Sequence, residues 1–245
     1  MKCILLAAGY ATRLFPLTVD IPKPLLDVCG KTVLERILNK IEEVCEIDEI
    51  YIVSNAKFFK RFRTWLNCYV SNKTIEVLND NTFYNDGRLG AIGDIRYAVK
   101  KKDICEDVLI MAADNLFDFD LCDFIEYYRN KGCDCITAHR MNDIASLRKT
   151  GVVTLDNEGK VLSFEEKPEK PESDLAVPPF YIYKHETLTL IDRYLDEGNN
   201  PDAPGNFIPW LIMKKDVYAF RFEGKRYDIG SPDSYRRVQE IFRGR

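Results

Sequence analysis

The chain has 245 residues and a formal net charge of -4. Its 46% hydrophobic and 30% charged residues are ordinary for a globular protein, which excludes a wholly disordered or collagen-like chain. The acidic balance argues against a protein that coats nucleic acid, and no apolar run is long enough to predict a membrane span. The apolar start leads straight into Tyr10 to Arg13, so we interpret it as a first strand and not as an export signal. These features predict a cytoplasmic protein that binds neither nucleic acid nor membrane.

The eight cysteines are expected to be small buried hydrophobic residues in a reducing compartment. The chain has no Cys-x-x-Cys pair and only two histidines, His139 and His185, so the ligand spacing of a zinc site is absent. Cys133 and Cys135 are expected to share one face of a strand.

Short apolar runs alternate with helical stripes through the first half of the chain, which is the βαβ pattern of a parallel sheet. The lysines at 100–102 are expected to follow a helix as its solvated end, where cations suit the helix dipole. Strands are predicted at 3–7, 50–53, 75–78, 108–111 and 135–138, and helices at 34–44, 58–69, 91–99 and 121–131.

The second half is expected to add shorter antiparallel strands to the same sheet. Residues 167–179 carry four prolines and predict an extended loop that leads to a strand. We therefore expect an α/β fold, with a Rossmann-like, mixed but mainly parallel sheet flanked by helices, in a single domain that spans residues 1–245. The strands of this half are predicted near 151–155, 161–164, 180–183 and 217–222, and the helices near 188–195 and 233–242.

The strongest signal is the segment Leu6-Ala7-Ala8-Gly9, whose small residues come at the end of the first strand, and Arg13 and Lys23 follow it. Small residues let backbone N–H groups approach an anion, and the two cations add positive charge. The residues alone favour a phosphate-binding loop over a structural turn. Two familiar patterns fail, because Gly9 is the only glycine of a G-x-G-x-x-G and Leu25 stands where Gly30-Lys31-Thr32 would need an earlier glycine.

Two aspartates have both a functional and a structural interpretation. Asp114 follows an apolar run, so it should lie at the C-terminal end of a strand, where open α/β sheets bind ligands. From the residues alone, a metal ligand and a cap of the next turn are equal alternatives for Asp114. Asp228 lies in a polar break before Gly230 and by itself is more typical of a turn. Glu166 and Lys167, before a proline, are by themselves most typical of a solvated charge run.

In these segments the chain resembles the sugar-phosphate nucleotidylyltransferases, whose pattern opens L-A-A-G-x-G-T-R-L-x-P-L-T and continues P-K-P-L. Matching segments follow in family order at 89–93, 112–117, 164–168 and 227–231, across nearly the whole chain. The residues at 112–117 and 164–168 are most similar to glucose-1-phosphate thymidylyltransferases. The resemblance implies the nucleotide-diphospho-sugar transferase fold. It also implies an enzyme that joins a nucleoside triphosphate to a sugar 1-phosphate and releases pyrophosphate.

The resemblance further implies roles for individual residues. The attacking phosphate is already an anion, so no general base is needed, and catalysis comes from positioning and charge. Arg13, Lys23, Asp114 and Lys167 form the implied catalytic set, and Asp114 and Asp228 are the implied ligands of one Mg²⁺. The implied nucleotide-binding residues are Leu6, Ala7, Ala8, Gly9, Arg13, Lys23, Gly87, Gly90 and Asp114, and the implied substrate-binding residues are Glu166, Lys167 and Tyr181.

Three departures from the family pattern leave alternatives open. Ala11 replaces a usual glycine, Ala91 lacks the usual hydroxyl, and Pro178-Pro179 stand where the family shows a glycine near the sugar. One alternative is a cytidylyltransferase that acts on a non-sugar alcohol phosphate or phosphonate, which residues 79–85 and the two prolines favour. The other is a nucleotide-binding regulatory protein without turnover. The base, the acceptor and the existence of a homo-oligomer stay open.

Overall fold

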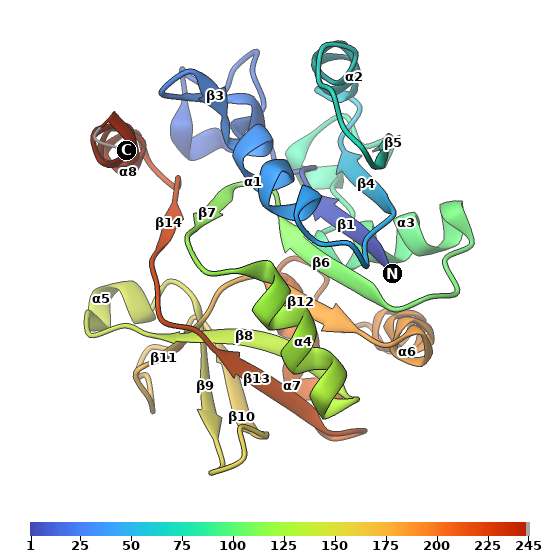
Figure 1. Ribbon diagram of the computed structural model, residues 1–245, viewed down its shortest axis with the longest axis vertical. Helices are drawn as coiled ribbons and strands as arrows, with labels where there is room; N and C mark the ends of the chain where they lie inside the picture. Colours follow the sequence, from blue (N-terminus) through green and yellow to red (C-terminus); the bar gives the residue numbers. More distant parts are fainter. Residues whose placement is uncertain (244–245) are drawn as a thin grey trace.

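The computed structural model describes residues 1–243, and its first half forms the parallel part of a ten-stranded sheet (Figure 1). Neighbouring strands here are all parallel, in the order β6-β1-β4-β5, with Cys3 opposite both Ile50 and Leu109. The strands are β1 (Lys2–Leu6), β4 (Glu49–Ser54), β5 (Thr74–Asn79) and β6 (Val108–Ala112). The helices are α1 (Val33–Glu42), α2 (Phe59–Leu66), α3 (Ala91–Lys102) and α4 (Leu121–Lys131). The predicted elements of this half are confirmed to within a few residues.

The second half extends the sheet beyond β6, and most of its strands are antiparallel as expected. The added strands are β8 (Asp134–Arg140), β9 (Gly151–Leu155), β10 (Val161–Glu166), β11 (Leu175–Val177), β12 (Phe180–Tyr183) and β13 (Val217–Arg221). The helices are α5 (Ile144–Leu147), α6 (His185–Asp196), α7 (Phe207–Leu211) and α8 (Pro232–Arg243). The mixed, mainly parallel α/β architecture is thus confirmed.

The expectation of purely antiparallel additions is wrong for β13, which pairs parallel with β8. Two helices, α6 and α7, separate β12 from β13. The chain therefore re-enters the sheet in the direction opposite to β12 and the same as β8. Residues 167–179 are also not wholly a loop, because β11 lies within them and bridges β8 and β9.

Several very short elements were not predicted, because two or three residues carry no readable periodicity. One of them corrects the expectation for Asp228, which does not lie in a polar break but ends a strand that pairs with β7. That pairing places Asp228 opposite Asn115, next to Asp114. These strands are β2 (Asp27–Val28), β3 (Lys31–Thr32), β7 (Asn115–Phe117) and β14 (Arg226–Asp228). Four 3-10 turns lie at Thr12–Leu14, Lys23–Leu25, Asn85–Gly87 and Pro204–Asn206.

Two large apolar cores hold the layers together, one on each face of the sheet, and a third, small cluster contains Leu147, Val152 and Ala176. One large core contains apolar residues of α1, α2, α4 and α8, and the other those of α3, α6 and α7. Helix α1 illustrates the cause: the Thr32 side chain accepts a hydrogen bond from the Glu35 N–H at 3.1 Å, and the buried stripe of Leu34, Ile37, Leu38 and Ile41 follows. Within residues 1–243, no helix is long and apolar enough to cross a membrane.

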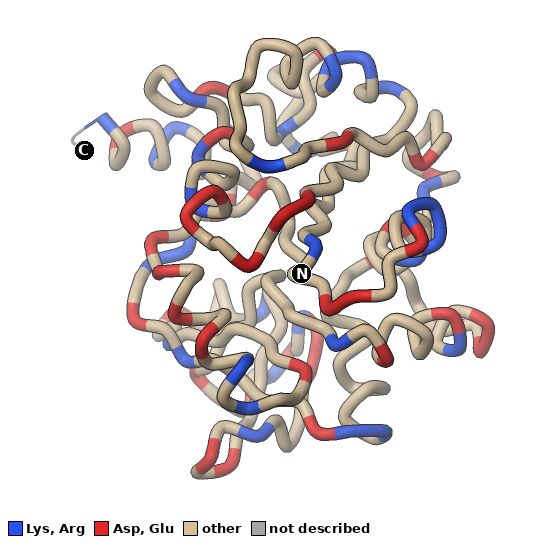
Figure 2. Tube along the Cα trace, turned by 45° about the vertical axis from the view of Figure 1, so that its right-hand side comes forward, with Lys and Arg blue, Asp and Glu red and all other residues tan. Residues whose placement is uncertain are grey.

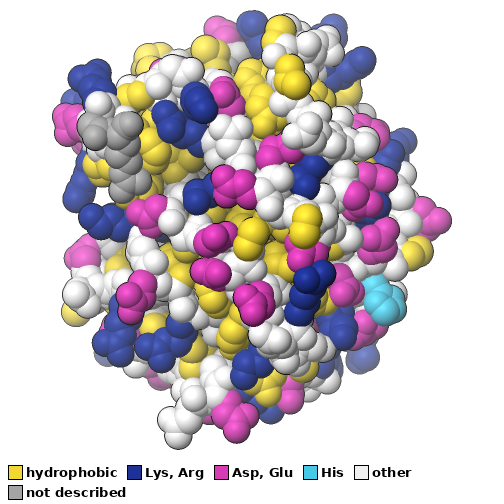
Figure 3. Space-filling model, in the orientation of Figure 1, with side chains coloured by type: hydrophobic (Ala, Val, Ile, Leu, Met, Phe, Trp, Pro, Cys, Tyr) yellow, Lys and Arg dark blue, Asp and Glu magenta, His cyan; other side chains and the backbone are white. Residues whose placement is uncertain are grey.

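Three expectations about side chains are corrected. Of the eight cysteines, only Cys3 and Cys135 are buried. Cys133 lies just before β8, so it does not share a face of that strand with Cys135. Four others, Cys45, Cys68, Cys105 and Cys122, are exposed. Lysines 100–102 form the last turn of α3 and do not follow it, because the helix ends only where Asp103 adopts a left-handed conformation. Acidic and basic residues are interspersed along the chain and over the face shown in the space-filling view (Figures 2 and 3).

Candidate active site

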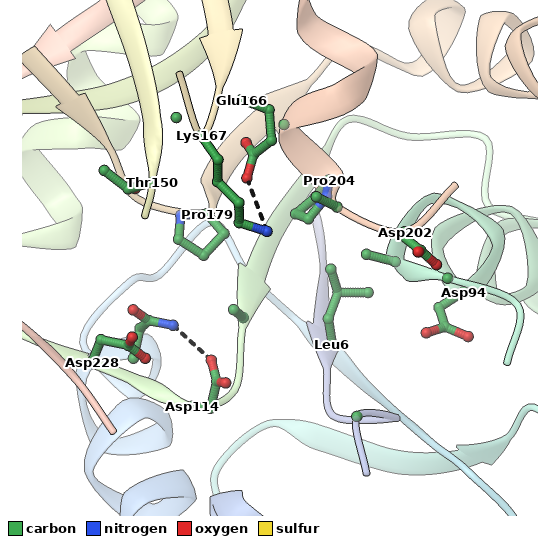
Figure 4. A pocket seen from close by; sticks show the side chains of 18 of the residues that line it. Leu6, Asp94, Asp114, Thr150, Glu166, Lys167, Pro179, Asp202, Pro204 and Asp228 are labelled. Carbon is green, nitrogen blue, oxygen red and sulfur yellow. Dashed lines mark hydrogen bonds and ion pairs between the residues drawn. The ribbon is translucent and has the colours of Figure 1, made fainter. Parts of the chain in front are cut away.

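The candidate site lies beyond the carboxyl ends of β1 and β6, as expected for an open α/β sheet. It consists of two cavities of about 400 Å³ and about 220 Å³, called here the larger and the smaller cavity. Both are lined by Leu6, Gly9 and Asp114, so they share a wall. The larger cavity is drawn in Figure 4 and extends between α3 on one side and β9, β10 and β12 on the other.

The small-residue loop after β1 forms the floor of both cavities. Asn55, at the end of β4, holds the loop by donating its amide N–H to the Ala8 carbonyl at 2.8 Å. Ala11 adopts a left-handed conformation with φ of 47°, which explains why the family shows a glycine here. Thr18 donates its hydroxyl to the Ala11 carbonyl at 2.8 Å and so fastens this turn.

Lys23 joins the two predicted metal ligands. Its Nζ donates a hydrogen bond of 2.7 Å to Asp114 Oδ2 and one of 3.3 Å to Asp228 Oδ1. Lys23 is buried, whereas Asp114 is half-buried and Asp228 is exposed. Pro22 and Pro24 shape the 3-10 turn that presents Lys23. Three charged groups from distant parts of the chain therefore meet at the wall between the two cavities.

The charges around Asp114 keep its carboxylate ionised. Burial alone would raise the pKa of Asp114, but the Lys23 ammonium, its hydrogen bond, the Asn115 amide and the more distant Arg226 together hold that pKa below its ordinary value. The Asn115 amide donates to Asp114 Oδ1 at 2.6 Å (Figure 4). A negative charge at the wall between the cavities is thus maintained at neutral pH.

Glu166 is not part of a solvated charge run, because its side chain is only 20% exposed and lines the larger cavity, whereas the Lys167 side chain lines the same cavity but is exposed. Burial raises the pKa of Glu166, and the Lys167 charge partly offsets this effect. A Cβ atom added to Gly205 would collide with the Glu166 carboxyl group in its present position, so Gly205 leaves room for this side chain. Lys167 has a φ of 53° and donates its backbone N–H to the Thr150 carbonyl at 3.1 Å, and its Nζ lies 3.6 Å from Glu166 Oε1 (Figure 4).

The wall opposite α3 carries Tyr181 and only one of the two prolines. Tyr181 is fully buried in β12 and lines the larger cavity. Pro179 also lines it, whereas Pro178 does not. The Pro179 carbonyl already accepts the Ala112 N–H at 3.1 Å, and its nitrogen carries no hydrogen. The backbone of Pro179 therefore offers a ligand no donor.

The structure brings nearly all predicted site residues to one cavity or the other. Arg13, Lys23 and Ala7 line the smaller cavity, and Ala8, Gly90, Glu166, Lys167, Tyr181 and Asp228 line the larger one. Gly87 is the exception, because it lies in the exposed 85–87 turn and lines neither cavity.

The prediction missed several cavity residues. Arg226 donates from Nη1 to Thr150 Oγ1 at 3.2 Å, and its Nη2 lies 3.8 Å from Asp228 Oδ2. It adds a third cation, with Lys149 and Lys167, on the Lys167 side of the larger cavity. The only sign of Arg226 in the sequence was that it lies two residues before Asp228, because residues i and i+2 share one face of a strand. Asp94, Asp202 and Arg88 on the α3 side carried no signal in the sequence.

Comparison with known proteins gives a consistent result. The family described as "Nucleotidyl transferase" matches residues 2–243. The "Bifunctional protein GlmU" of Methanococcus aeolicus is 28% identical over 95% of this chain and 52% of its own length. A putative mannose-1-phosphate guanyltransferase of Sulfolobus acidocaldarius is 28% identical over 97% of this chain and 62% of its own. A glucose-1-phosphate adenylyltransferase of Thermotoga neapolitana is 30% identical over 95% and 58%. The chain thus spans little more than half the length of these relatives.

Two solved structures share the fold. A UDP-glucose pyrophosphorylase complexed with UDP-glucose superposes with a TM-score of 0.79 at 21% identity, over 99% of this chain and 98% of that one. A putative glucose-1-phosphate thymidylyltransferase from Bacillus anthracis gives a TM-score of 0.79 at 22% identity, over 99% and 95%. The mixed, mainly parallel sheet with flanking helices is the fold of these proteins.

Proposed function

Because the chain belongs to the nucleotidyl transferase family, we propose that it is an enzyme that joins a nucleoside triphosphate and a sugar 1-phosphate to give a nucleoside-diphosphate sugar and pyrophosphate. The observation that carries the proposal is Lys23, which pairs with Asp114 and Asp228 at the wall shared by the two cavities. Two adjoining cavities suit a reaction between two substrates, and the charges lie where the reacting phosphates would meet.

The residues at this wall fit a divalent cation, Mg²⁺ in our proposal. Asp114 and Asp228 direct their oxygens at one cation already, the Lys23 ammonium, at 2.7 and 3.3 Å. Within the described part of the chain no three His, Cys, Asp or Glu side chains gather around one point. A hard cation bound through two carboxylates, with water and substrate phosphate as further ligands, is the usual form of a magnesium site. When bound, it would supply charge stabilisation at the α-phosphate.

The chain's own charges divide between the two substrates in this proposal. Arg13 and Lys23 face the smaller cavity and would hold the triphosphate and the departing pyrophosphate. Lys167 would orient the phosphate of the acceptor in the larger cavity, and Glu166 would accept hydrogen bonds from its hydroxyl groups. An acceptor oxygen then attacks the α-phosphorus while the bond to the pyrophosphate oxygen breaks. No proton has to be removed from the nucleophile.

A single assay tests the proposal. The purified chain is incubated with each of four nucleoside triphosphates, crossed with several sugar 1-phosphates, and pyrophosphate is measured with and without Mg²⁺. We expect pyrophosphate release that depends on both substrates and on the metal. Nucleotide binding without release in any combination would show a regulatory protein and overturn the proposed enzyme.

One observation favours a second candidate, a cytidylyltransferase for a non-sugar alcohol phosphate or phosphonate. Pro179 gives the acceptor wall no backbone donor, and the aromatic ring of Tyr181 lies beside it. A wall with fewer backbone donors leaves fewer partners for hydroxyl groups, and so suits an acceptor that carries fewer of them. Release of pyrophosphate from CTP with small alcohol phosphates, and not with sugar phosphates, would select this candidate.

We further propose that residues 1–245 act as a single nucleotidyltransferase domain in the cytoplasm, in nucleotide-sugar biosynthesis. Four exposed cysteines that form no disulfide support a reducing compartment, since exposed thiols oxidise readily in an oxidising one. Neither nucleic acid nor membrane is a partner in this proposal. Light scattering of the purified chain would decide whether it forms a homo-oligomer.

A further inference from the structure

Asp94 is a buried carboxyl group that the proposed reaction does not use. It lies in the first turn of α3, is only 6% exposed, and lines the larger cavity. Within residues 1–243, its Oδ1 has no hydrogen-bond partner. An unpaired buried polar atom costs free energy, so its presence in a cavity wall points to a partner that a ligand supplies.

The place of Asp94 identifies which part of the nucleotide reaches it. The triphosphate end is marked by Arg13 and Lys23 in the smaller cavity, and the acceptor end by Glu166 and Lys167. Figure 4 shows Asp94 and Asp202 across the pocket from Asp114 and Asp228. The α3 side is therefore left for the nucleoside, at the far end from the phosphates.

Two of the backbone donors at the start of α3 are already used. The Ala91 N–H donates to the Asp202 carbonyl at 3.3 Å, and the Ile92 N–H donates to the Pro201 carbonyl at 3.0 Å. Gly90 allows this close approach, because a Cβ there would come within 2.6 Å of the Pro201 oxygen. Arg88 Nη2 and Asp202 Oδ2 form an ion pair of 2.8 Å on this side of the larger cavity. With no hydroxyl at Ala91, the Asp94 carboxyl is the unpaired polar side chain that this turn can offer a ligand.

We propose that Asp94 is the specificity residue for the nucleobase, and that its carboxyl hydrogen-bonds the polar edge of the base; the inference rests on the proposed function. Burial, reinforced by the neighbouring Asp80 carboxylate, raises the pKa of Asp94 to about 8. The group is therefore mostly protonated at neutral pH. A neutral carboxyl presents one donor beside one acceptor, and so pairs with a base edge that presents an acceptor beside a donor. Tyr10 also faces Asp94, and its hydroxyl is paired with Thr82 at 3.3 Å.

Two variants of Asp94 and a matched control test this role. Asp94→Ala removes both hydrogen-bonding atoms, whereas Asp94→Asn keeps a neutral group with one acceptor and a donor. Asp103→Asn is the matched control. Asp103 is exposed and caps the other end of α3, away from the cavity, and Asn readily adopts its left-handed conformation. Binding of the four nucleoside triphosphates is measured by calorimetry, and KM by pyrophosphate release. Ribose 5-triphosphate, which lacks a base, is the reference ligand.

We expect Asp94→Ala to weaken binding of the preferred nucleotide by at least about tenfold and to narrow the selectivity among the four bases. Asp94→Asn and Asp103→Asn should stay within about threefold of the unmodified chain, and no variant should change binding of ribose 5-triphosphate. An equal loss for the base-free ligand, an equal loss in Asp94→Asn, or unchanged selectivity in Asp94→Ala would overturn the inference. Each of these results leaves pyrophosphate release by the unmodified chain intact. Absence of that release would instead overturn the proposed function.

Discussion

Asp114 and Asp228 both pair with Lys23, so the loss of either carboxylate should disturb the same part of the site. We expect Asp114→Asn and Asp228→Asn each to fold normally and to lower turnover by at least about 100-fold, because the stabilisation of charge on a transferring phosphate is worth several kcal/mol. Pyrophosphate release at saturating concentrations of both substrates measures this effect, and circular dichroism reports the fold.

Asp233→Asn is the matched control for these two variants. Asp233 is exposed on α8 and pairs only with Arg236 at 3.6 Å within the described chain, so its loss should leave turnover unchanged. Full activity of Asp228→Asn would remove Asp228 from the proposed metal site and leave Asp114 as the remaining one of the two proposed ligands.

Arg13 and Lys167 lie in different cavities and should affect different substrates. Arg13→Ala should raise KM for the triphosphate and for pyrophosphate in the reverse reaction, whereas Lys167→Ala should raise KM for the acceptor, since each loses a charge-assisted contact to one substrate only. Steady-state kinetics with both substrates varied separate the two patterns. Identical profiles would contradict the division of the site between two cavities.

The sequence predicted individual site residues where a neighbouring pattern marked them. Asp114 follows an apolar run that identifies its strand, and Lys23 lies in a motif with two prolines. By contrast, the surroundings of Arg226 and Asp94 exist only in the folded chain. Arg226 donates a hydrogen bond to Thr150, which is distant in the sequence, and Asp94 is buried because α3 packs against the sheet. Burial and pairing across distant segments are not encoded in local spacing, so sequence patterns cannot show them.

At the scale of elements, β12 determines the chemistry of the wall that we assign to the acceptor. It lies between β6 and β8 and begins directly after the two prolines, so Pro179 stands at the cavity without an N–H. Specificity for a hydroxyl group needs a polar partner that the wrong substrate leaves unpaired. With this donor missing, we expect either a deoxygenated or otherwise modified acceptor, or weak preference among hexose 1-phosphates.

Comparison of kcat/KM for glucose 1-phosphate, its hydroxyl epimers and small alcohol phosphates tests this expectation. One missing neutral contact corresponds to about 1 to 3 kcal/mol, so the preference for glucose should stay below about a thousandfold. A larger preference would show that side chains such as Glu166 supply the discrimination without any backbone donor.

Long elements were predictable and short ones were not. The four parallel strands and their helices carry five or more residues of clear periodicity. Strands β7 and β14 have three residues each and exist because they pair with one another, which places Asp228 beside Asp114. The direction of β13 depends on how α6 and α7 pack, which is a property of the assembled layers. The fold class therefore followed from the sequence, while the small sheet that completes the site did not.

At the scale of the whole molecule, the site places carboxyl groups with opposite pKa shifts in one continuous pocket. Asp114 has a lowered pKa despite its burial, because Lys23 compensates for it, whereas burial raises the pKa of Glu166 and of Asp94. A lowered pKa stabilises the fold above the ordinary pKa of the group, and a raised pKa stabilises it below. Pairing with a cation therefore determines on which side of its ordinary pKa each carboxyl group favours folding.

Among these carboxyl groups, we expect Asp94 to give the largest change of folding stability with pH that one substitution can test. Its pKa rises from 3.8 in the unfolded chain to about 8 in the folded protein, so the folded state holds the proton more tightly. Its contribution to stability is complete below the unfolded pKa and is lost progressively as the pH rises toward the folded pKa, by about 1.4 kcal/mol for each pH unit. Asn cannot ionise, so Asp94→Asn should be more stable than the unmodified chain at about pH 7.5 and lose most of that advantage at about pH 5. Asp80 and Tyr10, which face Asp94, are unchanged in this comparison. Urea unfolding at the two pH values measures the difference, with Asp103→Asn as control, and a difference independent of pH would show that Asp94 does not change its charge in this range.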